Sequence, residues 1–188
     1  MWPFRKNKID NNLKVIIEEI QKQLNDADGN IRAETVYSLA IPPRSHVVPS
    51  EIRVKMMIFV LRNDDYVIAR SDAAKAILRW ASELRQLSAF GDSSLLLLHD
   101  KEVTIIVPAL IESLSDAGTV PSYAAEALGQ VGSKAVSAVP ALIHLLDSKD
   151  IILQLDASKA LKMITGEDLG QDSFKWQDWW DKNKSSVS

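Results

Sequence analysis

The chain contains VPALIESLSDAGTVPSYAAEALGQVG at 107–132 and VPALIHLLDSKDIILQLDASKALKMITG at 139–166, two stretches that share their first five residues. In both, leucine and aspartate follow the shared start, and an alanine-rich segment comes next. Leu128 and Leu161 close equivalent turns of these segments 33 residues apart. A sequence period of this length indicates stacked helical repeats, because a single repeat cannot bury its apolar face alone.

The same pattern occurs twice more upstream, as IRAETVYSL at 31–39 and ARSDAAKAI at 69–77. Each copy has an apolar residue eight positions before its closing leucine or isoleucine. Small side chains fill the middle of the copies, among them Ala73, Ala74, Ala124, Ala125 and Ala157. Small residues let neighbouring helices approach closely, which the stacking of repeats requires.

Apolar spacing predicts one amphipathic helix near 10–25, followed by four helix pairs. The first helices are expected near 30–41, 65–82, 119–131 and 150–165, and the second helices near 50–62, 103–115, 137–147 and 173–184. Six of the seven prolines are assigned to turns or first helical positions, and Gly118, Gly129, Gly132 and Gly166 to helix ends. We therefore expect an all-α chain: a flexible tail over 1–9, then one α-α superhelix over 10–188 with an insertion near 84–102.

These residues resemble the HEAT-repeat family, and most of all its short bacterial type named after the phycobilisome lyase repeats. The family's aspartate at the end of the second helix is matched by Asp64, Asp116 and Asp147, and its arginine early in the first helix by Arg32 and Arg70. Pro121 and Gln154 stand at that arginine position in the last two copies, so the match is incomplete. The ending ITGEDLGQDSFKWQDWW at 164–180 is similar to the family's C-terminal cap. The resemblance implies a HEAT or armadillo-type α-solenoid in a bacterial protein.

Composition and spacing argue against most kinds of catalytic centre. The chain has no cysteine, and His46, His99 and His144 lack the spacing of a zinc motif. The glycines are isolated, so no phosphate-binding loop is evident, and the serines at 93–94 follow no predicted strand. We expect no enzyme activity, no cofactor, no metal and no small-molecule substrate. The net charge of -3 also argues against a nucleic-acid-binding protein.

The hydropathy of the chain and its first residues indicate where in the cell the protein is expected. No apolar run approaches the roughly 20 residues that span a bilayer, and the basic start of the chain lacks a signal-peptide core. We expect a cytoplasmic protein. Trp2 and Phe4 lie beside three cations, so the first residues either touch a membrane surface or form a disordered tail, and we favour the tail.

Three tryptophans near the C-terminus share one helical face. Trp176, Trp179 and Trp180 are spaced i, i+3 and i+4. We interpret them as a hydrophobic cap that closes the last repeat near Leu155, Leu161 and Ile164, because terminal repeats must cover their open side. The alternative is an aromatic platform for a ligand.

Two long connections and the distribution of charge suggest where a partner binds. The connections at 41–49 and 84–102 both join the helices of one pair, so we expect them on the same edge of the stack, where insertions often mark a binding face. Residues 1–90 carry a net charge of about +3 and residues 91–188 about -6, which favours an acidic partner for the first half. The expected contact residues are Pro42, Pro43, Arg44, Arg53, Arg62, Phe90, Leu95, Leu96, Leu97 and Leu98. The four leucines could instead form a buried turn.

Function is expected to follow from binding. The main hypothesis is that the chain is a non-catalytic scaffold or adaptor that binds another protein. One specific form of this hypothesis is an inhibitor or immunity-type partner of that protein. The resemblance to the phycobilisome relatives supplies an alternative, a chaperone-like subunit that helps attach bilin chromophores to proteins. A nucleic-acid enzyme on a HEAT-like fold is a third hypothesis, which the acidic balance disfavours.

Overall fold

Helices form where apolar residues recur at three- and four-residue spacing. The computed structural model describes residues 11–89 and 100–185, and helices are the only regular elements in that part of the chain. They are α1 (Asn11–Leu24), α2 (Gly29–Ser38), α3 (Arg44–Val47), α4 (Ser50–Asn63), α5 (Val67–Ala89), α7 (Asp100–Ser113), α8 (Val120–Val131), the 3-10 helix η1 (Gly132–Ala138), α9 (Val139–Leu145), α10 (Ile151–Thr165) and α11 (Ser173–Asn183). The expected all-α class is confirmed, and most boundaries lie within a few residues of the prediction.

Aspartates fix the start of three helices. The side chains of Asp28, Asp150 and Asp172 accept hydrogen bonds from backbone N–H groups in the first turns of α2, α10 and α11. Such caps satisfy donors that have no partner within the helix, and substituting one by alanine typically costs about 1 kcal/mol. Gly166 ends α10 with a φ of 83°, a left-handed conformation that glycine adopts without strain.

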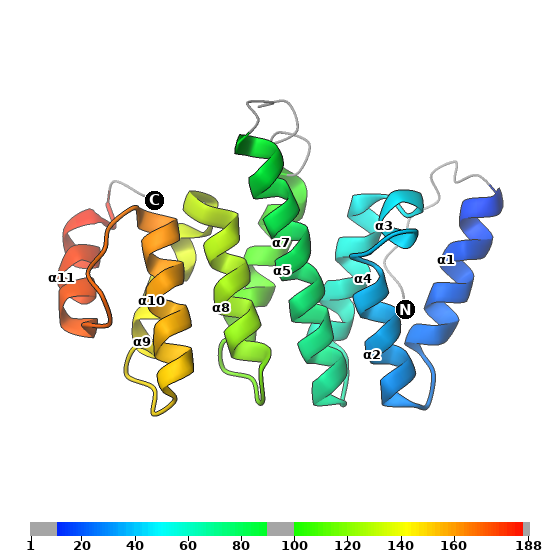
Figure 1. Cartoon of the computed structure of the whole chain (residues 1–188), viewed down its shortest axis with the longest axis horizontal. Coiled ribbons are helices and arrows are strands. Elements are labelled where there is room, and N and C mark those ends of the chain that lie inside the picture. The colour runs from blue at the N-terminus through cyan, green and yellow to red at the C-terminus, as the bar shows by residue number, and fades with distance from the viewer. Residues whose placement is uncertain (1–10, 90–99, 186–188) are drawn as a thin grey trace.

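The first helices of the four pairs pack side by side. α2 packs against α5, α5 against α8 and α8 against α10, while α4, α7 and the η1–α9 segment lie behind them (Figure 1). The rear helices pack on the next front helix in the chain: α4 on α5, α7 on α8 and α9 on α10. α1 covers α2 at one end of this row, and α11 covers α9 at the other.

Close packing between the front helices depends on small residues. Ala73, Ala124 and Ala157 have no exposed surface. Gly129, expected at a helix end, lies inside α8, which corrects the prediction. A Cβ atom at this position would lie 3.1 Å from the Cα atom of Ala160 in α10. A larger residue here would require α10 to move by a few tenths of an ångström, so the glycine fits the close approach of two helices rather than a turn.

The structure also departs from prediction in the second helices and connections. Pro108 lies inside α7, because that helix begins at Asp100 rather than near the proline. The assignment of Pro108 to a turn or helix start was wrong, and its exposed ring is accommodated on the solvent side of the helix. The connection at 41–49 contains the short helix α3, and α5 continues to Ala89. Part of the expected insertion at 84–102 is therefore helical.

Candidate functional site

The row of helices has two edges with different chemistry. α2, α5, α8 and α10 all end on the edge at the top of Figure 1, where α3 also lies. We call this the upper edge, and it consists of the C-terminal ends of these four helices together with α3. The lower edge consists of the connections 25–28, 64–66, 114–119 and 146–150. The connection 41–49 and the described parts of the predicted connection 84–102, residues 84–89 and 100–102, thus lie on one edge, as the pairing of helices predicts.

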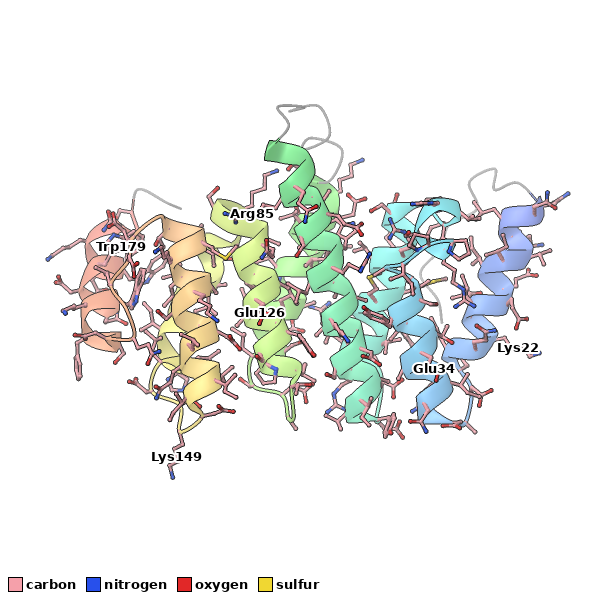
Figure 2. All side chains as sticks on the ribbon, in the orientation of Figure 1. Lys22, Glu34, Arg85, Glu126, Lys149 and Trp179 are labelled. Carbon is pink, nitrogen blue, oxygen red and sulfur yellow. The ribbon has the colours of Figure 1, made fainter. Side chains whose placement is uncertain are left out.

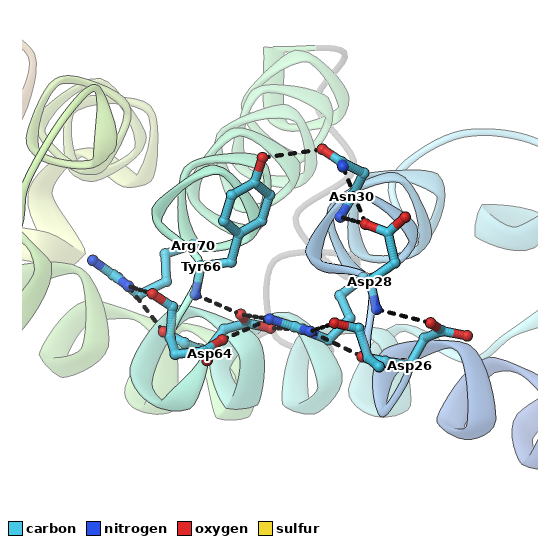
Figure 3. A network of polar contacts seen from close by, with 9 residues as sticks. Asp26, Asp28, Asn30, Asp64, Tyr66 and Arg70 are labelled. Carbon is cyan, nitrogen blue, oxygen red and sulfur yellow. Dashed lines mark hydrogen bonds and ion pairs between the residues drawn. The ribbon is translucent and has the colours of Figure 1, made fainter.

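Arginine–aspartate pairs join the connections of the lower edge (Figure 3). Arg32 donates from Nε and Nη2 to the two carboxylate oxygens of Asp64, both at 2.8 Å, and from Nη1 to the carbonyl of Asp26 at 2.8 Å. Arg70 makes the equivalent set: two bonds of 2.7 Å to Asp116 and one of 2.9 Å to the carbonyl of Asp64. Each guanidinium therefore bonds to two successive connections in the same geometry.

These pairs shift the pKa values of their members. The hydrogen bonds from Arg70 lower the pKa of Asp116, although burial opposes the shift. Burial raises the pKa of Asp64, but the bonds from Arg32 and the Tyr66 N–H outweigh it, so the net pKa is lowered. The ionised forms of Asp64 and Asp116 are thus favoured by arginines of the same chain.

Two of the predicted contact residues, Arg53 and Arg62, are engaged in contacts within the chain. Arg53 is only 7% exposed, and its guanidinium donates to the carbonyls of Leu39 and Val48, both at 3.0 Å. Its place among the contact residues was wrong, because it serves to tie α4 to the connection before it. Arg62 is exposed, but it lies near the end of α4 on the lower edge and forms two hydrogen bonds with Glu112 in α7.

Three predicted contact residues lie together on the upper edge. Pro42, Pro43 and Arg44 line a cavity of about 420 Å³ between α1, α2 and α3. Arg44 donates to Ser38 Oγ at 2.6 Å and to Gln23 Oε1 at 2.8 Å, both neutral acceptors. The predicted residues Phe90, Leu95, Leu96, Leu97 and Leu98 lie outside the described residues, as do Trp2 and Phe4.

Arg85 is an upper-edge residue that sequence reasoning did not single out. It lies within the predicted insertion 84–102, and Figure 2 shows it beside the end of α8. Its Nη1 donates to the carbonyl of Gly129 at 3.2 Å. The only signal in the sequence was that it is the last arginine of the chain. It lines a second cavity of about 420 Å³, bordered by the ends of α5, α8 and α10.

The tryptophans at the C-terminal end form a structural cap. Trp176 has no exposed surface, and its Nε1 donates to the carbonyl of Gly170 at 2.8 Å. Trp179, marked in Figure 2, meets the Trp176 ring edge-on at a centroid distance of 6.0 Å, and Trp180 is half-buried against the core. The cap packs against α9, and Leu155, predicted beneath it, is 43% exposed. A buried indole leaves no platform for a ligand at Trp176.

Comparison with family models and with curated proteins does not place the chain in a family. No family model and no curated protein matches it. Across residues 11–89 and 100–185, no group of three or more His, Asp or Glu side chains is arranged to hold a metal ion. In the same part of the chain, no helix combines the length and apolar character needed to cross a membrane.

Proposed function

We propose that the chain is a HEAT-type α-solenoid that binds an acidic protein through its upper edge and performs no catalysis. The observation that carries this proposal is the environment of Arg44 and Arg85. In the described contacts, Arg32, Arg62, Arg70 and Arg79 each pair with a carboxylate, whereas Arg44 and Arg85 donate only to neutral oxygens. Both of these arginines lie on the upper edge, and each lines a cavity.

A cation without a carboxylate partner contributes to binding in a particular way. A neutral acceptor orients the guanidinium without forming an ion pair with it, so the cation can still pair with an incoming carboxylate. Such charges mainly increase the association rate and select acidic partners. The arginines of the lower edge offer little to a partner, because each is already neutralised within the chain.

The repeated contacts of the lower edge support the solenoid part of the proposal. Arg32, Arg70 and Gln154 occupy equivalent positions, and each donates to the backbone carbonyl six residues earlier. Gln154 makes this bond to Ser148 at 2.6 Å although it lacks a guanidinium. One local geometry recurring in three pairs favours successive copies of one structural unit, as a solenoid requires.

The test is affinity capture from the native host with two matched variants. Arg44→Glu combined with Arg85→Glu removes the two upper-edge cations. Lys22→Glu combined with Lys149→Glu changes the net charge equally at exposed sites on α1 and the lower edge (Figure 2). Circular dichroism confirms that both variants fold, and mass spectrometry identifies the captured molecules.

We expect the wild type and the lysine variant to capture the same acidic protein and the arginine variant to lose it. Association with the purified partner should slow as salt rises, because exposed charges are screened beyond ~10 Å at 0.1 M ionic strength. Equal capture by the arginine variant would overturn the proposal. Capture of nucleic acid or of a phycobiliprotein with its bilin would favour one of the other two hypotheses.

A further inference from the structure

The cavity beside Arg85 has the composition of a pocket for an apolar side chain. It measures about 420 Å³ and lies where α5, α8 and α10 end. Its apolar lining consists of Ala81, Leu84, Val103, Val131, Met163 and Ile164. Gln130, Ser133 and Thr165 add polar groups. Binding pockets in proteins typically have volumes of about 300–1,000 Å³ and a mostly apolar lining with a few polar groups, as here.

The charge around this cavity distinguishes it from four other cavities in the described part of the chain. Its lining includes Arg85 and Lys134 and no carboxylate. Four further cavities each have at least one Asp or Glu in their lining. Lys134 pairs with Asp100, which lies outside the cavity lining, so Arg85 carries most of the uncompensated positive charge. The cavity is therefore apolar inside and positive at its border.

The backbone carbonyl groups around the cavity favour an apolar group over a carboxylate inside it. α8 and α10 both end at this cavity, and the carbonyl groups at a helix C-terminus carry partial negative charge. A carboxylate inside the cavity would be repelled by these carbonyls, whereas an apolar group would not. Carboxylates are favoured only at the border, where Arg85 has N–H donors beyond the one that it gives to Gly129.

We infer that this cavity takes one large apolar side chain of an acidic peptide segment, with carboxylates flanking that side chain bound by Arg85 and Lys134. The inference rests on the proposed function and adds the chemistry of the partner. An apolar anchor surrounded by charged pairs is the arrangement in which a few residues supply most of the binding energy.

The experiment measures fluorescence polarisation of a labelled peptide with the full chain. The probe is Gly-Asp-Glu-Phe-Glu-Asp-Gly. One control peptide has Ala in place of Phe, and another has Asn and Gln in place of Asp and Glu. The protein variants are Arg85→Glu, Arg85→Gln, Ser133→Trp and the distant control Lys22→Glu. Ser133 is exposed at the border, so its replacement by tryptophan obstructs the cavity without entering the core.

We expect saturable binding that falls at least about tenfold when Phe becomes Ala. Neutral flanks and Arg85→Glu should each weaken binding at least about fivefold, and Arg85→Gln should fall between wild type and Arg85→Glu. Ser133→Trp should also weaken binding, and Lys22→Glu should leave it unchanged. The neutral variant keeps the test valid if Arg85→Glu fails to fold.

Absence of saturable binding, or binding that is insensitive to Ser133→Trp and to both Arg85 variants, would overturn the inference. An equal loss with Lys22→Glu would do the same, because it would show attraction by overall charge alone. These results are separable from failure of the proposed function. If the partner captured from the host depends on Arg44 and Arg85 but tolerates Ser133→Trp, the upper edge stands and the cavity is not the anchor site.

Discussion

At the scale of single residues, Trp176 is the clearest determinant of stability. Its indole is fully buried and hydrogen-bonded to Gly170. We predict that Trp176→Ala lowers the free energy of unfolding by about 3–5 kcal/mol, measured by urea denaturation. Phe174→Ala is the control on the same helix: that ring is 87% exposed, so the change should stay within about 0.5 kcal/mol. Equal effects of the two variants would show that α11 does not cap the row.

Two carboxyl groups should respond to pH in opposite directions. Hydrogen bonds from Arg70 lower the pKa of Asp116 in the folded chain, so the ionised Asp116 carboxylate stabilises the fold above about pH 4. This stabilisation is lost as the pH falls through the pKa of Asp116 in the folded chain. Burial, and secondly the charge of Asp156, raises the pKa of Glu126, so ionisation of Glu126 costs stability as pH rises. At pH 7, Asp116→Asn should therefore destabilise the chain and Glu126→Gln should stabilise it.

Thermal unfolding at a series of pH values measures both effects. The difference between wild type and Asp116→Asn should shrink as pH falls below about 4, because the carboxyl group becomes protonated in the wild type. The advantage of Glu126→Gln should disappear over acidic pH, where Glu126 is protonated in the folded and unfolded chain alike. Differences that stay constant with pH would show that neither carboxyl group is coupled to folding in this way.

At the scale of elements, the contact between α8 and α10 leaves no room at Gly129. Alanine has a higher helix propensity by about 1 kcal/mol, so this effect alone predicts that Gly129→Ala stabilises α8. The added Cβ atom would lie 3.1 Å from Ala160 Cα and 3.2 Å from Met163 Sδ. We predict a net loss of about 1–3 kcal/mol in the free energy of unfolding, because overpacking outweighs propensity. Gln130→Ala is the neighbouring control, with a change within about 0.5 kcal/mol.

The same elements show what the sequence could and could not predict. Apolar periodicity located the main helices because burial imposes that spacing on every amphipathic helix. The roles of Arg44 and Arg53 were not separable, since both are arginines in or after the same connection. Their difference depends on where carbonyls lie in three dimensions: those of Leu39 and Val48 face Arg53, whereas Arg44 meets side chains at the surface. Gly129 was misplaced for a similar reason, because its neighbour is 31 residues away.

At the scale of the whole molecule, the arginines of the basic first half are divided between the two edges of the row. The sequence suggested a basic first half and an acidic second half. The structure instead places Arg62 on the lower edge with Glu112, and Arg44 and Arg85 on the upper edge with neutral acceptors. The long helices extend from one edge to the other, so a charge count by sequence position mixes residues of the two edges. The Arg85 cavity could not be predicted for the same reason, since it forms only where the C-terminal part of α5 lies beside the ends of α8 and α10.

The arginine contacts of the lower edge also have a mechanical consequence. The hydrogen bonds of Arg32 and Arg70 link three successive connections of the lower edge, 25–28, 64–66 and 114–119. Pro121 occupies the next arginine position and has no side-chain donor, and no described polar contact joins 114–119 to 146–150. Further along the chain, Ser173 donates to Asp147 and Gln154 donates to the carbonyl of Ser148. These bonds hold the connection 146–150 to the starts of α10 and α11. Between these two sets of connections, α8 and α10 are held together by the helices themselves, through the hydrogen bond from Ser122 to Asp156 and the close packing of Gly129 against Ala160. A force that spreads the lower edge at this point is therefore resisted by helix packing rather than by contacts between connections.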